Sequence, residues 1–234
     1  MNKFIRTLFV ITLIILFIIA FSDSYLSLSI DNLAYVLAIG IDKSTTDKLQ
    51  VSFQFSTTTA ISESGTSQKT PTIIKTVDAS SLSSAINLIN SYMGKQINMS
   101  HCKAIIFSEE LAYEGISDEI FTLINDTQNR PSSNIIISQC NAKYYIESTK
   151  HELENLIAKY YEILPNSSTY TGFIPNATIG DFFNSLICKT CMPYAILGNV
   201  NANQSENIGL AAFVDDKFVR KIRCVRNNFF FSYS

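Results

Sequence analysis

The side chains that most often carry catalysis or bind metals are few in this sequence and lie far apart. The chain has 234 residues with two histidines, His101 and His151, and five cysteines. Neither histidine has a cysteine or a carboxylate at the spacing of a metal site or a general-base pair. The dipeptide His151-Glu152 also lacks the second histidine of a zinc-protease helix. The sequence therefore predicts no catalytic residue and no metal site.

The cysteines include one close pair, Cys188 and Cys191, in the stretch CKTC. A redox pair of this spacing usually precedes a helix, whose dipole lowers the pKa of one thiol. Here the pair follows an expected helix and precedes Met192-Pro193, which is the reverse order. A local disulfide stays open if the pair lies in an oxidising compartment. The odd number of cysteines does not form a disulfide framework and favours buried, unreactive thiols at most positions.

No cofactor motif is present. The stretch AIGID has a single glycine and is followed by a second strand, so it is not a dinucleotide-binding turn. No Gly-x-Ser-x-Gly elbow occurs. Arg130, in NDTQNRPSS, is an isolated cation between an expected helix and an expected strand. It is either a charge placed at the helix C-terminus or a contact with a partner. No cofactor is predicted, and the binding residues stay undefined.

The net charge of −2 gives a nucleic-acid partner no electrostatic support. Hydrophobic residues make up 47% of the chain and charged residues 16%, so the polar surface relies on neutral groups. A chain of this length can bury a sizeable core in one large domain or two small ones.

The N-terminus has the order of a secretory leader. Lys3 and Arg6 precede a run that is apolar from Leu8 to Phe21 except for Thr12. Positive charge before the run keeps the N-terminus in the cytoplasm, so the remainder is expected outside it. The only small-residue cleavage pattern is the weak Ala20-Phe21-Ser22. Both a cleaved signal and an uncleaved anchor fit, and we expect residues 1–24 to stay as the membrane anchor.

The remaining chain predicts an α+β fold, with a mixed sheet and packed helices behind the N-terminal hydrophobic anchor. Apolar runs and alternating patterns predict strands, and periods of three and four residues predict helices. The expected strands are 33–41, 49–57, 72–78, 102–107, 134–140, 194–200 and 208–216. The expected helices are 80–93, 109–115, 117–126, 142–148, 151–164 and 178–188.

Two details refine this outline. Asp78 or Ser80 is expected to cap the helix at 80–93, and Gly94 is expected to end it. The composition changes at the polar stretch 201–207, which we interpret as a boundary between domains. The predicted division is therefore an anchor at 1–24, an α+β domain at 25–200, and a second region at 201–234.

Four segments resemble the Ger(x)C spore germination proteins, the C subunits of germinant receptors. They occur in the family's order, which makes the resemblance specific over residues 30–220. The segments are IDNLAYVLAIGIDKSTTDKLQVSFQF, MSHCKAIIFSEELAYEGI, LINDTQNRPSSNIIISQCNAKYYIES and ENIGLAAFVDDKFV. The region 25–200 then corresponds to the family's N-terminal domain, and 201–234 to a truncated start of its C-terminal domain.

The resemblance implies a non-enzymatic protein on the outer, non-cytoplasmic face of the spore inner membrane. It implies two integral-membrane partners, the A and B subunits, and an indirect relation to a nutrient germinant. The family usually has a lipid-modified cysteine followed by tryptophan after the leader, where this chain has FSDSY. We therefore expect the uncleaved leader to replace the lipid as the tether.

The expected function is a contribution to nutrient-triggered germination through partner binding. Two alternatives remain: an extracytoplasmic module that binds a small ligand on its own, and a non-functional truncated copy. A thiol enzyme that uses Cys188 and Cys191 is the least favoured reading, because the pair lies on the wrong side of its helix.

Overall fold

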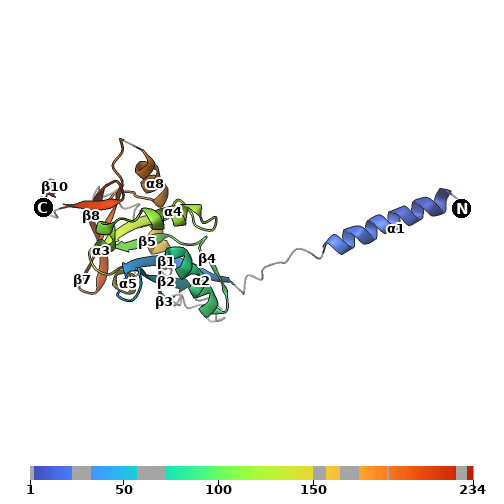
Figure 1. Cartoon of the computed structure of the whole chain (residues 1–234), viewed down its shortest axis with the longest axis horizontal. Coiled ribbons are helices and arrows are strands. Elements are labelled where there is room, and N and C mark those ends of the chain that lie inside the picture. Colours follow the sequence, from blue (N-terminus) through green and yellow to red (C-terminus); the bar gives the residue numbers. More distant parts are fainter. Residues whose placement is uncertain are drawn as a thin grey trace, which may run out of the picture. The chain divides into compact units, whose positions relative to one another are not determined.

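The computed structural model describes residues 3–22, 33–56, 72–149, 157–163, 174–188, 190–224 and 231–233. The chain divides into two compact units, Met1–Leu33 and Ala34–Ser234. The first unit contains helix α1 (Lys3–Ser22) (Figure 1). Its apolar side chains between Phe9 and Phe17 are exposed. Within the described ranges, no helix has the length and apolarity needed to cross a bilayer. The predicted anchor stays a prediction.

The second unit is built on a mixed sheet, in which the described residues form ten strands in the order β10-β9-β8-β7-β6-β5-β1-β2-β3, with β4 paired to β1. The strands are β1 (Leu33–Lys43), β2 (Leu49–Ser56), β3 (Thr72–Ala79), β4 (Gln96–Asn98), β5 (Ala104–Ser108), β6 (Asn134–Ser138), β7 (Tyr194–Asn201), β8 (Gln204–Val214), β9 (Lys217–Cys224) and β10 (Phe231–Tyr233). The helices are α2 (Leu82–Met93), α3 (Glu109–Glu114), α4 (Ser117–Asn125), α5 (Ala142–Glu147), α6 (Ile157–Ile163) and α8 (Ile179–Ile187). The predicted α+β class is confirmed.

The centre of the sheet consists of the four parallel strands β1, β5, β6 and β7. Antiparallel strands extend it on both sides, with β2 and β3 beyond β1 and with β8 to β10 beyond β7. Parallel neighbours need a crossover, and the helices between these strands provide it. The carboxyl ends of β1, β5 and β6 consequently meet at one edge of the sheet.

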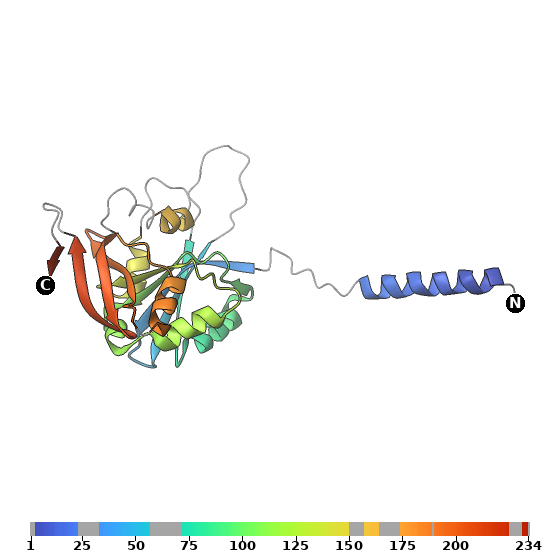
Figure 2. The same ribbon diagram turned by 90° about the horizontal axis from the view of Figure 1, so that it is seen from above.

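Helices cover both faces of the sheet (Figure 2). On one face lie α2, which packs on β2 and β3, and α4 and α8, of which α8 packs on β6. This is the face to which β1 and β2 direct Ile39 and its antiparallel partner Phe53. The other face carries Gly40 and Gln54, where α5 packs on Gly40 and Tyr161 of α6 donates a hydrogen bond to Gln54. Because the central strands are buried on both faces, their sequences are continuous apolar runs.

Two local expectations can be compared directly with the structure. The α2 cap is Ser81, whose side chain accepts a hydrogen bond from the Ser84 amide, so the choice of Asp78 or Ser80 was wrong. Gly94 ends the helix in the left-handed region, with φ of 60°, as predicted. The expected boundary at 201–207 falls in the hairpin that pairs β7 with β8. The domain division itself stays a prediction.

Gly40 provides a test of the packing between β1 and α5. A Cβ at this position would lie 2.8 Å from Cδ1 of Ile146 and 3.2 Å from the carbonyl carbon of Ala142. We expect Gly40→Ala to lower the free energy of unfolding by about 1–3 kcal/mol because it overpacks this contact. Chemical denaturation of the full chain measures the loss.

Ile146→Val supplies the matched control because it removes the carbon that the new methyl group meets. It should cost about 0.5–1.5 kcal/mol alone. Combined with Gly40→Ala, it should cost less than the sum of the two single changes, since the residues are in contact. If the two costs in unfolding free energy add exactly, the contact with Ile146 is not the cause of the destabilisation by Gly40→Ala.

Candidate functional site

A polar cavity of about 140 Å³ lies at the carboxyl ends of β1, β5 and β6. Open sheets with parallel strands commonly bind ligands outside this edge, because the loops that leave the strands converge there. The cavity therefore qualifies as the candidate site of this fold. Its lining residues are Asp42, Lys43, Ser108, Glu109, Glu110, Gln139, Cys140 and Asn141.

Asp42 is the most deeply buried charged residue of the cavity, with 2% of its surface exposed. Its two carboxylate oxygens accept hydrogen bonds from the first amides of α5, at 2.6 Å from Ala142 and 2.9 Å from Lys143. Burial raises the pKa of Asp42, and these two amides and Ser108 oppose the rise. The carboxylate thus fixes the start of α5 against the end of β1.

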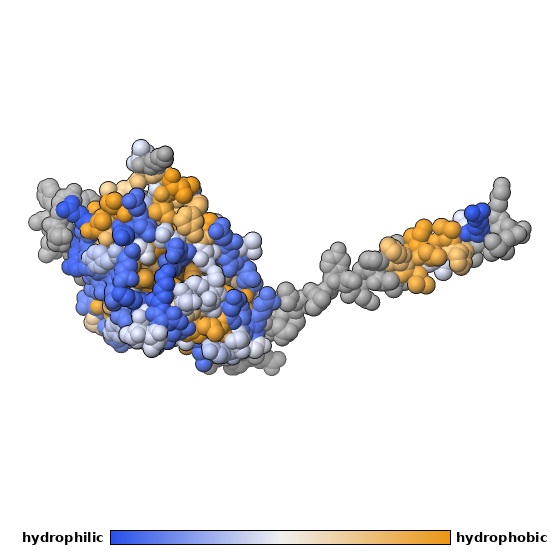
Figure 3. All heavy atoms as spheres, viewed as in Figure 1, coloured by the Kyte–Doolittle hydropathy of each residue, from blue (hydrophilic) through white to orange (hydrophobic). Residues whose placement is uncertain are grey.

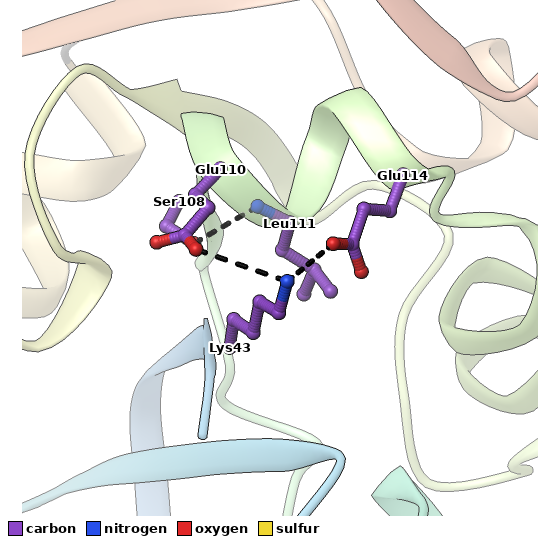
Figure 4. A network of polar contacts seen from close by, with 5 residues as sticks. All are labelled: Lys43, Ser108, Glu110, Leu111 and Glu114. Atoms are coloured by element: carbon purple, nitrogen blue, oxygen red, sulfur yellow. Dashed lines mark hydrogen bonds and ion pairs between the residues drawn. The ribbon is translucent and has the colours of Figure 1, made fainter. Parts of the chain in front are cut away.

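Lys43, the next residue of β1, points from the sheet towards α3 (Figure 4). Its ammonium group pairs with Glu114 and lies 3.9 Å from Glu110, so one lysine contacts two of the three glutamates of the helix. Ser108 ends β5 and caps α3, because its hydroxyl accepts a hydrogen bond of 3.4 Å from the amide of Leu111. All these groups are partly exposed except Ser108 and Leu111, so the ion pairs contribute little stability.

Strand β9 contacts two residues that line the cavity. Lys221 pairs with Glu109 at 2.7 Å, and Arg223 donates a hydrogen bond of 3.1 Å to the side-chain oxygen of Gln139. The side-chain nitrogen of Gln139 is buried without a partner in the described part of the chain. These contacts connect the C-terminal antiparallel strands to the end of the parallel core.

The arrangement does not pair a nucleophile with a base. Cys140 is the one thiol of the lining, and burial raises its pKa, so it stays protonated at neutral pH. Both oxygens of Asp42 accept hydrogen bonds from backbone amides, and the Cys140 thiol lies within hydrogen-bond distance of the Ser138 hydroxyl and not of this carboxylate. Binding a small polar molecule is the chemistry that these groups support.

Apart from Cys140, the histidines and cysteines considered from the sequence that the structure describes lie away from this cavity. His101 is exposed, and its ring meets Tyr35 edge to face at 4.9 Å. Cys188 and Cys191 form a disulfide directly after α8. This is the local disulfide that the sequence left as an open possibility. Cys102 is buried, and burial raises its pKa to about 12. His151 lies outside the described residues.

Arg130 was the one isolated cation noted from the sequence, and it lines a second, larger cavity of about 310 Å³. It lies four residues beyond Asp126, where α4 ends. Sequence reasoning did not find the Asp42 cavity, because its residues come from three strand ends that are distant along the chain. In the described ranges, no group of three or more histidines, cysteines and carboxylates could hold a metal ion.

An exposed apolar surface lies over α8 and its neighbours (Figure 3). Phe121 of α4 and Phe183 of α8 meet edge to face at 5.5 Å. Ile187 at the end of α8 is 59% exposed, and Met192 beyond the disulfide is 60% exposed. We refer to these four residues as the α8 surface. Exposed apolar groups gathered in this way are typical of sites that contact another molecule.

Residues 27–197 match the family described as the spore germination protein N-terminal domain. The chain belongs to the Ger(x)C family. This confirms the resemblance read from the four segments and supports a role related to germination. The family is one of germination proteins and is not a known enzyme family. No curated protein and no solved structure matched the chain in the same comparisons.

The raised pKa of Asp42 makes a prediction about stability and pH. A carboxyl group whose pKa is raised above its ordinary 3.8 favours the folded state when protonated. That contribution is present below the ordinary value and is lost as pH rises through the higher pKa of the folded state. We therefore expect the free energy of unfolding of the wild type, minus that of Asp42→Asn, to fall as pH rises from 3 to 7. The slope at each pH is set by the difference in bound protons between the unfolded and the folded state.

Urea denaturation across this pH range measures the difference. Asp42→Ala is the comparison variant, because it leaves the amides of Ala142 and Lys143 without an acceptor and should be less stable than Asp42→Asn at every pH. A wild-type minus Asp42→Asn difference that rises with pH would show that the amides outweigh burial.

Proposed function

We propose that this protein is the C subunit of a spore germinant receptor and that it acts by binding, not by catalysis. The family match over residues 27–197 carries the proposal. Its partners would be the A and B subunits, which are integral membrane proteins, and the nutrient germinant would act on it indirectly. The absence of a nucleophile paired with a base at the Asp42 cavity supports a binding role.

The α8 surface is the part of the protein best suited to contact these partners. Ile187 and Met192 are 59% and 60% exposed, and burying each of them on a partner would be favourable by up to about 1.5–3 kcal/mol. The disulfide between Cys188 and Cys191 closes the turn between Ile187 and Met192. The two most exposed residues of the surface are thereby held on either side of a short closed loop.

The proposed location is the spore inner membrane, with the second unit on the outer, non-cytoplasmic face. Lys3 and Arg6 before the apolar run support this orientation by the positive-inside rule. The exposed apolar side chains of α1 supply the attachment, and no cysteine is available near the leader for a lipid.

Deletion of the gene tests the proposal in spores. Spores without the gene, and without paralogues that could replace it, should lose germination on at least one nutrient while still germinating with non-nutrient triggers. The wild-type gene should restore the response. A double variant Ile187→Ser and Met192→Ser should restore it poorly because partner binding is weakened.

Ile73→Ser is the matched control, since Ile73 is 45% exposed on β3 and does not belong to the α8 surface. It should restore germination as the wild type does. The protein level in spores is measured for each variant, so that loss of protein is separated from loss of binding. Unchanged germination of the deletion strain on every nutrient would refute the receptor role.

The attachment makes a separate prediction. Protein extracted from spore membranes should retain the leader, so that N-terminal sequencing or mass spectrometry reads a chain that starts at or near Met1. Removal of residues 1–22 should release the protein from the membrane fraction. A membrane-bound protein whose N-terminus begins at Asp23 or later would rule out the leader as the tether.

A further inference from the structure

The cavity that contains Arg130 lies at the opposite end of the parallel strands from Asp42. It opens where β5 and β6 begin and where α8 starts, and its volume of about 310 Å³ is roughly twice that of a cavity known to hold benzene. Seven of its eight lining residues have polar or charged side chains, and the eighth is a cysteine: Cys102, Lys103, Arg130, Ser132, Asn134, Glu162, Asn176 and Thr178.

The loop that carries Arg130 is fixed on both sides of this residue. The Arg130 carbonyl accepts a hydrogen bond of 3.0 Å from the amide of Ser133, and the Pro131 carbonyl accepts one of 2.9 Å from Gly180. Asn129 is buried, and its side chain donates to the end of α4 at 3.2 Å. The backbone of Arg130 is therefore held in place before any ligand arrives, which reduces the entropic cost of binding.

The charges of the cavity leave one cation without a partner. Lys103 pairs with Glu162 at 3.1 Å, and the hydrogen bond from Lys103 lowers the pKa of Glu162. The guanidinium of Arg130 makes no hydrogen bond or ion pair within the described ranges, although it lines the same cavity. With one lysine neutralised by one glutamate, the lining carries one uncompensated positive charge.

The start of α8 does not supply further donors. The amide of Ile179 donates to Ser133, that of Gly180 donates to Pro131, and that of Asp181 donates to the Thr178 hydroxyl. A negatively charged ligand in this cavity would consequently be held by the Arg130 side chain and not by the end of the helix.

We propose that the Arg130 cavity binds a small organic molecule through a single carboxylate group. A guanidinium presents a planar pair of donors that matches the two oxygens of a carboxylate. One carboxylate compensates the one free charge of the lining, whereas a doubly charged phosphate would leave a negative charge without a partner. The uncharged groups of Ser132, Asn134, Asn176 and Thr178 would contact the rest of the molecule. This site is independent of the receptor role proposed above.

Calorimetric titration of the full chain at about pH 8, where inorganic phosphate is mainly doubly charged, tests the proposal, with acetate, benzoate and phosphate as probes and chloride at matched ionic strength as the reference. The cavity should bind acetate or benzoate in a saturable manner and should bind neither phosphate nor chloride. Arg130→Gln should weaken carboxylate binding at least tenfold, and Arg130→Lys should weaken it less, because it keeps the charge without the paired donors.

Two further variants separate the cavity from general charge effects. Glu162→Gln frees Lys103 and adds a positive charge to the lining, so it should tighten carboxylate binding and allow phosphate to bind. Lys75→Gln removes one charge from the exposed strand β3 and should change nothing. Circular dichroism of each variant confirms that it is folded. The proposal fails if no carboxylate binds saturably, if phosphate alone binds, or if Arg130→Gln binds as the wild type does.

Discussion

Burial of the parallel strands on both faces is the constraint on which the rest of this structure depends. β1, β5, β6 and β7 lie at the centre of the sheet, and parallel neighbours can be joined only by chain that crosses over a face. The crossovers are helices, so both faces become apolar core and polar groups are excluded from the middle of the strands. The buried runs from Ala104 to Phe107 and from Ile135 to Ile137 meet this requirement directly.

Polar groups then collect where the strands end, and the two cavities described above lie there. At the carboxyl ends, Asp42 is used to hold α5, and burial raises its pKa because the site gives it little water. At the amino ends, Lys103 and Glu162 neutralise each other, and Arg130 has no charged partner among the described residues. At the carboxyl ends of the strands, the charge of Asp42 therefore stabilises the fold. At the amino ends, the charge of Arg130 is the one that we propose binds a ligand.

Patterns of local origin were predicted well from the sequence, and those that depend on distant contacts were not. The alternation from Leu49 to Phe55 and the helical period at 82–93 gave the correct elements, because burial of one face determines them. Strands β4, β9 and β10 were missed because they are short, or polar and cationic, and form only by pairing with an existing edge. Arg130 was noticed as an isolated charge, but its cavity needs β5, β6, α6 and α8 together. Asp42 was not noticed, since its partners lie 100 and 101 residues away.

The helix α8 connects the two features that matter most for binding. Its first turn is tied through Gly180 to the loop of Arg130, and its last residue, Ile187, belongs to the α8 surface. Communication between the two would need a second position of the helix that one ligand favours. The edge-to-face contact of Phe182 with Phe213 at 4.9 Å and the hydrogen bond from Gly180 to Pro131 fix α8 to strand β8 and to the Arg130 loop in this structure. The structure contains one position of α8, so the proposed cavity and the α8 surface are treated as two separate features of the same helix.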